Sequence, residues 1–158
     1  MEDQIGTFIA QMLAQEEQLE IPVEEQVSPP ETDWAEALGL ADLETAHGLP
    51  EGLLAAVLQK ESSGNPMAES SAGAQGLFQF MPATAEAFGI DPLVPEEAAS
   101  GAAQYYAKLL KQFGGDLKKA LAAYNWGPGN VKRKGLEKAP KETQNYVKDI
   151  VLALAGGK

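Results

Sequence analysis

The chain has 158 residues, of which 44% are hydrophobic and 22% are charged, and this size and composition fit one globular domain with a real core. It has no cysteine and one histidine, which excludes disulfides and thiolate metal sites and leaves too little for a Ser–His triad or a histidine-rich metal cluster. The net charge of −11 comes from residues 1–59, which hold 13 acidic residues and no Lys or Arg, so phosphates would be repelled and nucleic acid is not an expected partner.

The first 33 residues are predicted to be an acidic appendage to the domain that follows. Apolar residues at helical spacing indicate a short amphipathic helix over about residues 4–19: Ile5, Phe8, Ile9, Met12 and Leu13. Residues 21–33 contain three prolines among glutamates, which is typical of an extended linker. The expected organisation is therefore an N-terminal helix and linker over 1–33 and one domain over 34–158.

The N-terminal residues show no pattern that would direct the chain across a membrane. The start, Met1-Glu2-Asp3, is acidic where a secretory signal needs positive charge. No stretch approaches the ~20 apolar residues of a membrane span. If the substrate lies outside the cytoplasm, we therefore expect delivery by a route other than general secretion.

From Trp34 onward the pattern predicts short helices joined by glycine-rich connections. Asp33 and Glu36 have capping-box spacing before a helix over 34–47 that ends at Gly48, and Pro50 suits the first turn of the next helix, which is broken at residues 62–66. Further helices are expected over about 82–88, 95–113, 117–124 and 140–156. Residues 68–80 are expected to form a loop with a little irregular strand, so the predicted fold class is mainly α.

Glu61 occupies an unusual position for a carboxylate. It lies three residues after Leu58 and four after Val57, so it continues the apolar face of its helix toward the core or a cleft wall. Desolvation and the partial negative charge of the helix C-terminus would both raise its pKa, which suits a general acid for glycosidic cleavage. Periodicity alone leaves the ordinary alternative open, namely a solvated glutamate at a frayed helix end.

Four ordered motifs over about 90 residues surround and follow this glutamate, and together they carry a family resemblance. They are Glu61-Ser62; Asn65-Pro66 with the run from Ala68-Glu69-Ser70 to Gly76-Leu77-Phe78-Gln79; Ala123-Tyr124-Asn125-Trp126-Gly127-Pro128-Gly129; and Thr143 with Tyr146-Val147. The chain resembles the lytic transglycosylases of the soluble, goose-lysozyme-like type. Two positions depart from the family pattern: Phe78 stands where methionine is commonest, and Trp126 where alanine is commonest.

The resemblance implies a mainly α, lysozyme-like fold with a substrate groove and a short irregular β segment. It implies cleavage of the bond between N-acetylmuramic acid and N-acetylglucosamine in peptidoglycan, with Glu61 as the single catalytic carboxylate and a 1,6-anhydromuramoyl product. It assigns substrate contacts to five residues: Ser70, Gln79, Tyr124, Asn125 and Tyr146. No cofactor and no metal are expected.

Several alternatives stay open at this point. Ser70 could serve as a loop turn residue, and Tyr124 could belong to the core. The same bond could be hydrolysed by water, as in a lysozyme-type muramidase, or the domain could bind peptidoglycan without turnover.

The combination of a cell-wall substrate and no export signal favours a protein of the phage virion that acts in the host periplasm and cell wall. Residues 1–20 would then contact other virion proteins. The alternatives are a domain processed from a larger chain and a bacterial protein exported by a route other than general secretion.

Overall fold

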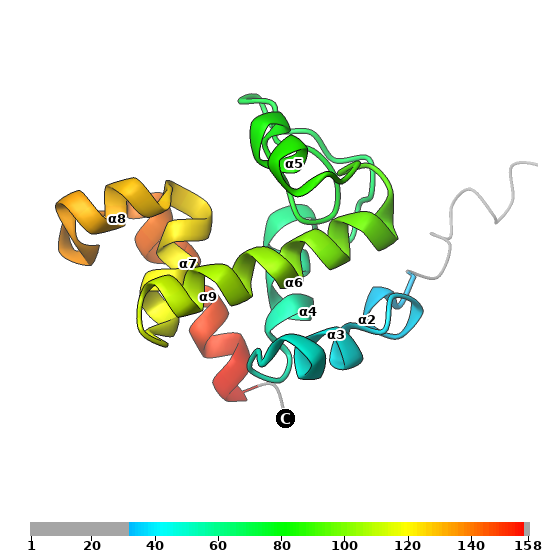
Figure 1. The fold of residues 1–158 in the computed structure, drawn as a ribbon, viewed down its shortest axis with the longest axis horizontal. Helices are drawn as coiled ribbons and strands as arrows, with labels where there is room; N and C mark the ends of the chain where they lie inside the picture. The colour runs from blue at the N-terminus through cyan, green and yellow to red at the C-terminus, as the bar shows by residue number, and fades with distance from the viewer. Residues whose placement is uncertain (1–31, 157–158) are drawn as a thin grey trace, which may run out of the picture. The chain divides into compact units, whose positions relative to one another are not determined.

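A computed structural model describes residues 32–156, which fold as helices joined by short connections (Figure 1). The helices are α2 (Trp34–Ala37), α3 (Leu40–His47), α4 (Leu53–Ser62), α5 (Pro82–Phe88), α6 (Pro95–Gln112), α7 (Leu117–Trp126), α8 (Pro128–Lys134), the 3-10 helix η1 (Leu136–Lys138) and α9 (Lys141–Gly156). Extended pairing in this part of the chain is limited to isolated bridges that join Gln75 to Glu69 and to Phe80. The predicted fold class, mainly α with a short irregular β segment, is confirmed.

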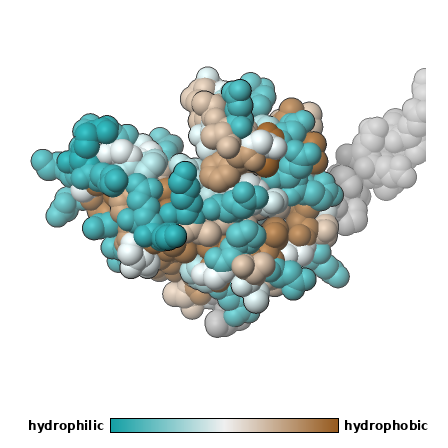
Figure 2. Space-filling model, in the orientation of Figure 1, coloured by the Kyte–Doolittle hydropathy of each residue, from teal (hydrophilic) through white to brown (hydrophobic). Residues whose placement is uncertain are grey.

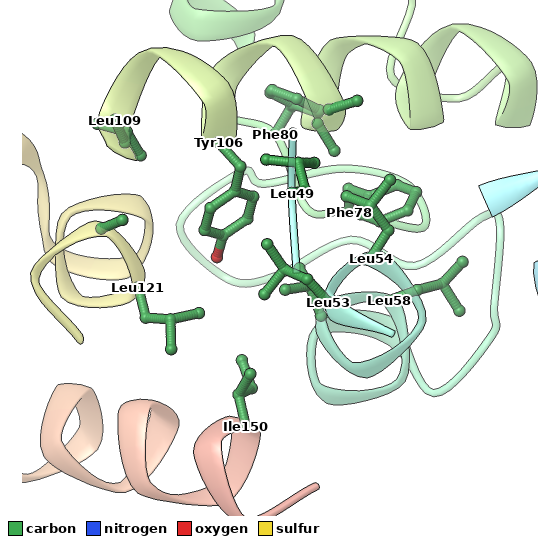
Figure 3. Close-up of a cluster of buried hydrophobic side chains, with 14 of the residues drawn as sticks. Leu49, Leu53, Leu54, Leu58, Phe78, Phe80, Tyr106, Leu109, Leu121 and Ile150 are labelled. Carbon is green, nitrogen blue, oxygen red and sulfur yellow. The ribbon is translucent and has the colours of Figure 1, made fainter. Parts of the chain in front are cut away.

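The long helix α6 organises the domain. It crosses the domain and contacts α3, α4 and α7, while α9 contacts α4 and α7 (Figure 1). Leucines of α4 meet Phe78 and Phe80 from the loop, Tyr106 and Leu109 from α6, Leu121 from α7 and Ile150 from α9 (Figure 3). Helix α4 is thereby held against α6 and α9.

The helix predicted over 34–47 is two helices in the structure. Helix α2 ends at Ala37, and Gly39 then adopts a left-handed conformation with φ of +62° before α3 begins. A glycine takes this conformation without the steric cost that a Cβ would bring. The predicted N-cap is confirmed, since the Asp33 side chain accepts a hydrogen bond from the Glu36 N–H.

Helix α4 begins at Leu53, not in the turn at Pro50 that the sequence favoured. A carboxylate from α3 fixes this start, because the N–H groups of Gly52 and Leu54 donate to Glu44 at 2.9 and 2.8 Å. Helix α8 was not predicted at all. It begins at Pro128, and proline favours the first helical position because its fixed φ suits a helix and its missing N–H is not needed there.

The predicted helix over 4–19 and most of the predicted linker, residues 21–31, lie outside the described residues. Within residues 32–156, no helix is both long and apolar enough to cross a membrane.

Candidate active site

Glu61 lies in the last turn of α4 and is half-buried, while the adjacent Lys60 is exposed. Burial raises the pKa of Glu61 to about 7, against an ordinary value of 4.5. A hydrogen bond with the Tyr146 side chain lowers this pKa, the negative charge of Glu142 raises it, and the positive charge of Lys60 lowers it. The direction expected from the sequence is therefore found, and the structure adds Glu142 to the causes.

A cluster of three tyrosines, which we call the tyrosine cluster, lies beside Glu61: Tyr106, Tyr124 and Tyr146. The hydroxyls of Tyr106 and Tyr146 are 3.1 Å apart, and the rings of Tyr106 and Tyr124 stack with centroids 4.4 Å apart and planes inclined by 8°. Burial raises the pKa of each hydroxyl well above its ordinary range, and the charge of Glu61 adds to the effect. The cluster therefore presents neutral phenols to the carboxyl group.

Tyr124 packs against the core and also lines a surface pocket. Its ring also contacts Tyr105 and Phe80, and its hydroxyl donates to the carbonyl oxygen of Phe78 at 2.8 Å. The residue is nevertheless half-buried and lines a surface pocket. Its ring is thus part of the packing, while one edge faces the pocket.

The pocket has a volume of about 310 Å³ and lies between the loop before α5 and the turn between α7 and α8. It brings three of the predicted substrate contacts together: Gln79, Tyr124 and Asn125. Glu61, Ser70 and Tyr146 are not among its lining residues. In the space-filling view the surface is hollowed between the part that carries α5 and the part that carries α8 (Figure 2).

Gln79 stabilises the loop that forms one side of the pocket. Its Nε2 donates to the carbonyl oxygens of Ala68 and Gly76 at 3.1 and 2.9 Å, and its backbone is in the left-handed region with φ of +52°. Gly76 also has a positive φ, and a Cβ at this position would collide with the carbonyl oxygen of Pro92. The backbone at Gly76 therefore lies close to that of Pro92, and only glycine fits there.

Ser70 is exposed and closes a turn. Its Oγ accepts from the N–H of Ala74 at 3.0 Å, and its own N–H donates to the Ala74 carbonyl oxygen at 2.9 Å. This is the turn role that the sequence left open as an alternative. The hydroxyl hydrogen is not used in the turn, so a further hydrogen bond from Ser70 is chemically possible.

Asn125 is held by a threonine to which the sequence assigned no role. The Thr143 hydroxyl, in a residue only 2% exposed, donates to Asn125 Oδ1 at 2.7 Å. The amide is thus oriented, and its Nδ2 group has no protein partner among the described residues. Sequence spacing contained a usable signal, because Thr143 lies three residues before Tyr146 and so shares its helix face.

Trp126, which departs from the family pattern, lines the pocket. The Lys134 ammonium lies over its ring, 5.9 Å from the centroid. Helix α8 exposes three consecutive basic residues, Lys132, Arg133 and Lys134, and the surface there is hydrophilic (Figure 2). Within residues 32–156, no three His, Asp or Glu side chains gather as a metal site would require.

Comparison with known proteins adds a family match. The model of the transglycosylase SLT domain matches residues 40–147, which is more than half of the chain. The transglycosylase of Enterobacteria phage PRD1 is 38% identical over 112 residues, and the peptidoglycan transglycosylase gp16 of Escherichia phage T7 is 36% identical over 122 residues. A solved structure of an inactive mutant of lytic transglycosylase Slt from Pseudomonas aeruginosa is similar with a TM-score of 0.66 and 28% identity.

The matched regions are parts of longer proteins. The phage PRD1 match covers 62% of this chain and 41% of that protein, and the phage T7 match covers 67% of this chain and 9% of that protein. The structural match covers 79% of this chain and 24% of the Pseudomonas chain.

Proposed function

The chain belongs to the family of the transglycosylase SLT domain, and on that premise we propose that it is a peptidoglycan lytic transglycosylase in which Glu61 is the catalytic acid and base. One observation carries the proposal: a half-buried glutamate whose pKa is about 7 lies against the tyrosine cluster. The relatives from phages PRD1 and T7 bear the name transglycosylase and support it.

In the first step, protonated Glu61 donates its proton to the oxygen that links N-acetylmuramic acid to N-acetylglucosamine. The bond from C1 to that oxygen breaks, and its electron pair leaves with the oxygen. The 2-acetamido group of the substrate stabilises the positive charge that develops at C1. A glutamate with a pKa near neutrality suits this role, because much of it still carries its proton at the pH of a cell wall.

In the second step, the Glu61 carboxylate takes the proton of the muramoyl C6 hydroxyl, and that oxygen bonds to C1. The product is a 1,6-anhydromuramoyl end, and Glu61 recovers its proton. Water is not consumed. The C6 hydroxyl is preferred to water because it is already positioned beside C1, which gives it a high effective concentration.

Substrate contacts are proposed for three residues that line the pocket, and supporting roles for two that do not line it. Asn125 would donate from the Nδ2 that Thr143 leaves free, and Gln79 would accept at its Oε1, since its Nε2 is used within the loop. Tyr124 would offer the edge of its ring. Ser70 would donate its hydroxyl hydrogen, and Tyr146 would act on the Glu61 carboxyl group.

The deciding experiment is mass spectrometry of the fragments released from purified sacculi. A lytic transglycosylase releases muropeptides one water lighter than those with a reducing end. Fragments with reducing ends would show lysozyme-type hydrolysis. No release at any enzyme concentration would indicate a protein that binds peptidoglycan without cutting it. Both outcomes would contradict the proposal.

We further propose that the chain works as part of a phage particle that opens the host cell wall from the periplasmic side, with residues 34–158 as the catalytic domain and residues 1–33 as an appendage. The phage origin of two relatives supports this placement. Residues 1–20 would bind other virion proteins. Deleting residues 1–32, which keeps the Asp33 cap of α2, should leave activity on sacculi unchanged and reduce association with particles. Loss of activity would contradict the domain boundary.

A further inference from the structure

Tyr106 is a buried polar side chain to which the proposed reaction gives no part. It is 0% exposed, and it extends from α6 into the core (Figure 3). Its ring is stacked on Tyr124, and the one hydrogen-bond partner of its hydroxyl among the described residues is the Tyr146 hydroxyl at 3.1 Å. A phenylalanine would fill the same space, so packing alone does not explain the oxygen.

Counting hydrogens gives the direction of this hydrogen bond. Each tyrosine hydroxyl has one hydrogen to donate. If Tyr146 donated to Tyr106, the Tyr106 hydrogen would be buried without an acceptor, and Tyr146 would have no hydrogen left for Glu61. If Tyr106 donates, its hydrogen has an acceptor, and the Tyr146 hydrogen stays available for Glu61, whose pKa a hydrogen bond with Tyr146 lowers. Burying a polar group without a partner is costly, and within residues 32–156 every buried side-chain nitrogen and oxygen has a partner.

We infer that Tyr106 is a positioning residue, whose hydroxyl donates to Tyr146 and thereby commits the Tyr146 hydrogen to the Glu61 carboxyl group. The inference deepens the proposed function and rests on it for the roles of Glu61. Hydrogen bonds in a chain polarise one another, so Tyr106 strengthens the bond that Tyr146 makes.

The hydrogen bonds that run from Tyr106 through Tyr146 to Glu61, which we call the relay, have two chemical effects. The relay stabilises the Glu61 carboxylate and so opposes the effect of burial, which suits a group that must first give a proton and then accept one. It also occupies one oxygen of the protonated acid as an acceptor. The O–H of the other oxygen is then left to the glycosidic oxygen.

The other ionisable groups around Glu61 do not change when the Tyr106 hydroxyl is removed. Apart from Tyr146, through which Tyr106 acts, they are Lys60 on α4, which pairs with Asp149 of α9, Tyr124 on α7, and Glu142 on α9. The variant Tyr106→Phe keeps the ring and alters no charge. A change in Glu61 titration in this variant therefore reports the relay.

The test is an NMR titration of the full chain with carbon-13 at the glutamate carboxyl carbons, in which Glu61→Gln identifies the Glu61 signal. We expect Tyr146→Phe to raise the Glu61 midpoint by about 1 unit and Tyr106→Phe to raise it by roughly 0.3 units. The double variant should titrate like Tyr146→Phe alone, because Tyr106 acts through Tyr146.

The sign of the shift decides the direction of donation. If Tyr146 donated to Tyr106, Tyr106→Phe would free the Tyr146 hydrogen for Glu61 and lower the midpoint. A lower or unchanged midpoint, or additive shifts in the double variant, would overturn the inference. Should Tyr106→Phe not fold, as judged from its amide spectrum, an unchanged midpoint in Tyr146→Phe would also overturn it.

The titration uses no substrate, so it separates this inference from the proposed function. If the chain shows the predicted shifts but releases no muropeptides, the relay is supported and the proposed reaction is contradicted. If the chain releases anhydro-muropeptides and shows no shift, the proposed reaction is supported and the relay is contradicted. In an active chain, Tyr106→Phe should shift the high-pH limb of the rate profile to higher pH, by the same amount as the Glu61 midpoint.

Discussion

Two glutamates lie at opposite ends of α4, and both are shielded from water. Glu44 comes from α3 and is 3% exposed at the start of α4, where its two oxygens accept from the N–H groups of Gly52 and Leu54. Glu61 lies in the last turn of α4, where burial raises its pKa to about 7 and the Tyr146 side chain is its hydrogen-bond partner.

The comparison teaches that burial alone does not decide what a carboxyl group can do. The N-terminus of a helix offers unpaired N–H groups and partial positive charge, which together suit an ionised acceptor. The C-terminus offers carbonyl oxygens and partial negative charge, which favour the protonated form. The same helix thus makes one glutamate a structural cap and leaves the other with a proton that it can give away.

The largest expected effect is the loss of activity when Glu61, at the C-terminal end of α4, is replaced. Glu61→Gln should reduce muropeptide release by about 10²–10⁴-fold, because the amide cannot transfer a proton to the sugar. The matched control is Glu36→Gln, an exposed position on α2, which should cut at the wild-type rate. Release rates from labelled sacculi measure both variants. A folded Glu61→Gln protein with normal activity would contradict the assignment.

At the N-terminal end of α4, the expected effect is on stability and not on activity. Glu44→Ala should lower the free energy of unfolding by about 3 kcal/mol, because two N–H groups lose their acceptors at a buried helix start. The rate per folded molecule should stay unchanged. Denaturant unfolding followed by circular dichroism gives the free energy. A loss under about 1 kcal/mol would mean that water replaces the carboxylate, and the cap would not be structural.

The third expected effect concerns pH and applies to Glu61. Its folded pKa of about 7 lies above the ordinary 4.5, so the folded state binds more protons in this range and stability falls as pH rises from 4.5 to 7. For a half-buried group this contributes about 2 kcal/mol, after a reduction for solvent screening. Glu61→Gln should lose this slope and exceed wild-type stability above pH 7. Parallel slopes in the two proteins would show that Glu61 titrates as if solvated.

The smallest expected effect tests the group that orients Asn125. Thr143→Val removes the hydroxyl and keeps the shape, so we expect kcat/KM to fall by about 5–10-fold, as the loss of one hydrogen bond predicts. The change should lie mainly in KM, and Thr143→Ser should restore most of it. Equal stability and an unchanged KM in Thr143→Val would show that the threonine only fills space.

Sequence patterns were sufficient where the physical cause is local. The helical spacing of Val57, Leu58 and Glu61 predicted the shielded carboxyl group, and Pro82 and Pro95 marked the beginnings of α5 and α6. The cap at Glu44 is different, because its acceptor and the N–H donors are eight and ten residues apart and lie on different helices. Nothing in the spacing of a glutamate within α3 indicates a partner in α4.

The site shows the same division. Motif residues such as Gln79 and Asn125 were identified from the sequence, and the structure brings them to one pocket. Helix spacing places Thr143 on the same face as Tyr146, but it does not identify Asn125 as its partner, because Asn125 belongs to another helix, 18 residues away. The contact between the Tyr106 and Tyr146 hydroxyls could not be predicted either, because 40 residues separate the two tyrosines.

The two anchored ends of α4 also limit how the chain can vary in length. Adding one residue between Leu54 and Glu61 would turn the carboxyl group by about 100° around the helix axis and move it by about 1.5 Å, away from Tyr146. The cap at Glu44 would be untouched, so the start of α4 would keep its place while the acid pointed elsewhere. Insertions and deletions that preserve activity must therefore fall outside this helix, in surface turns such as the exposed one at Gly114 and Gly115 between α6 and α7.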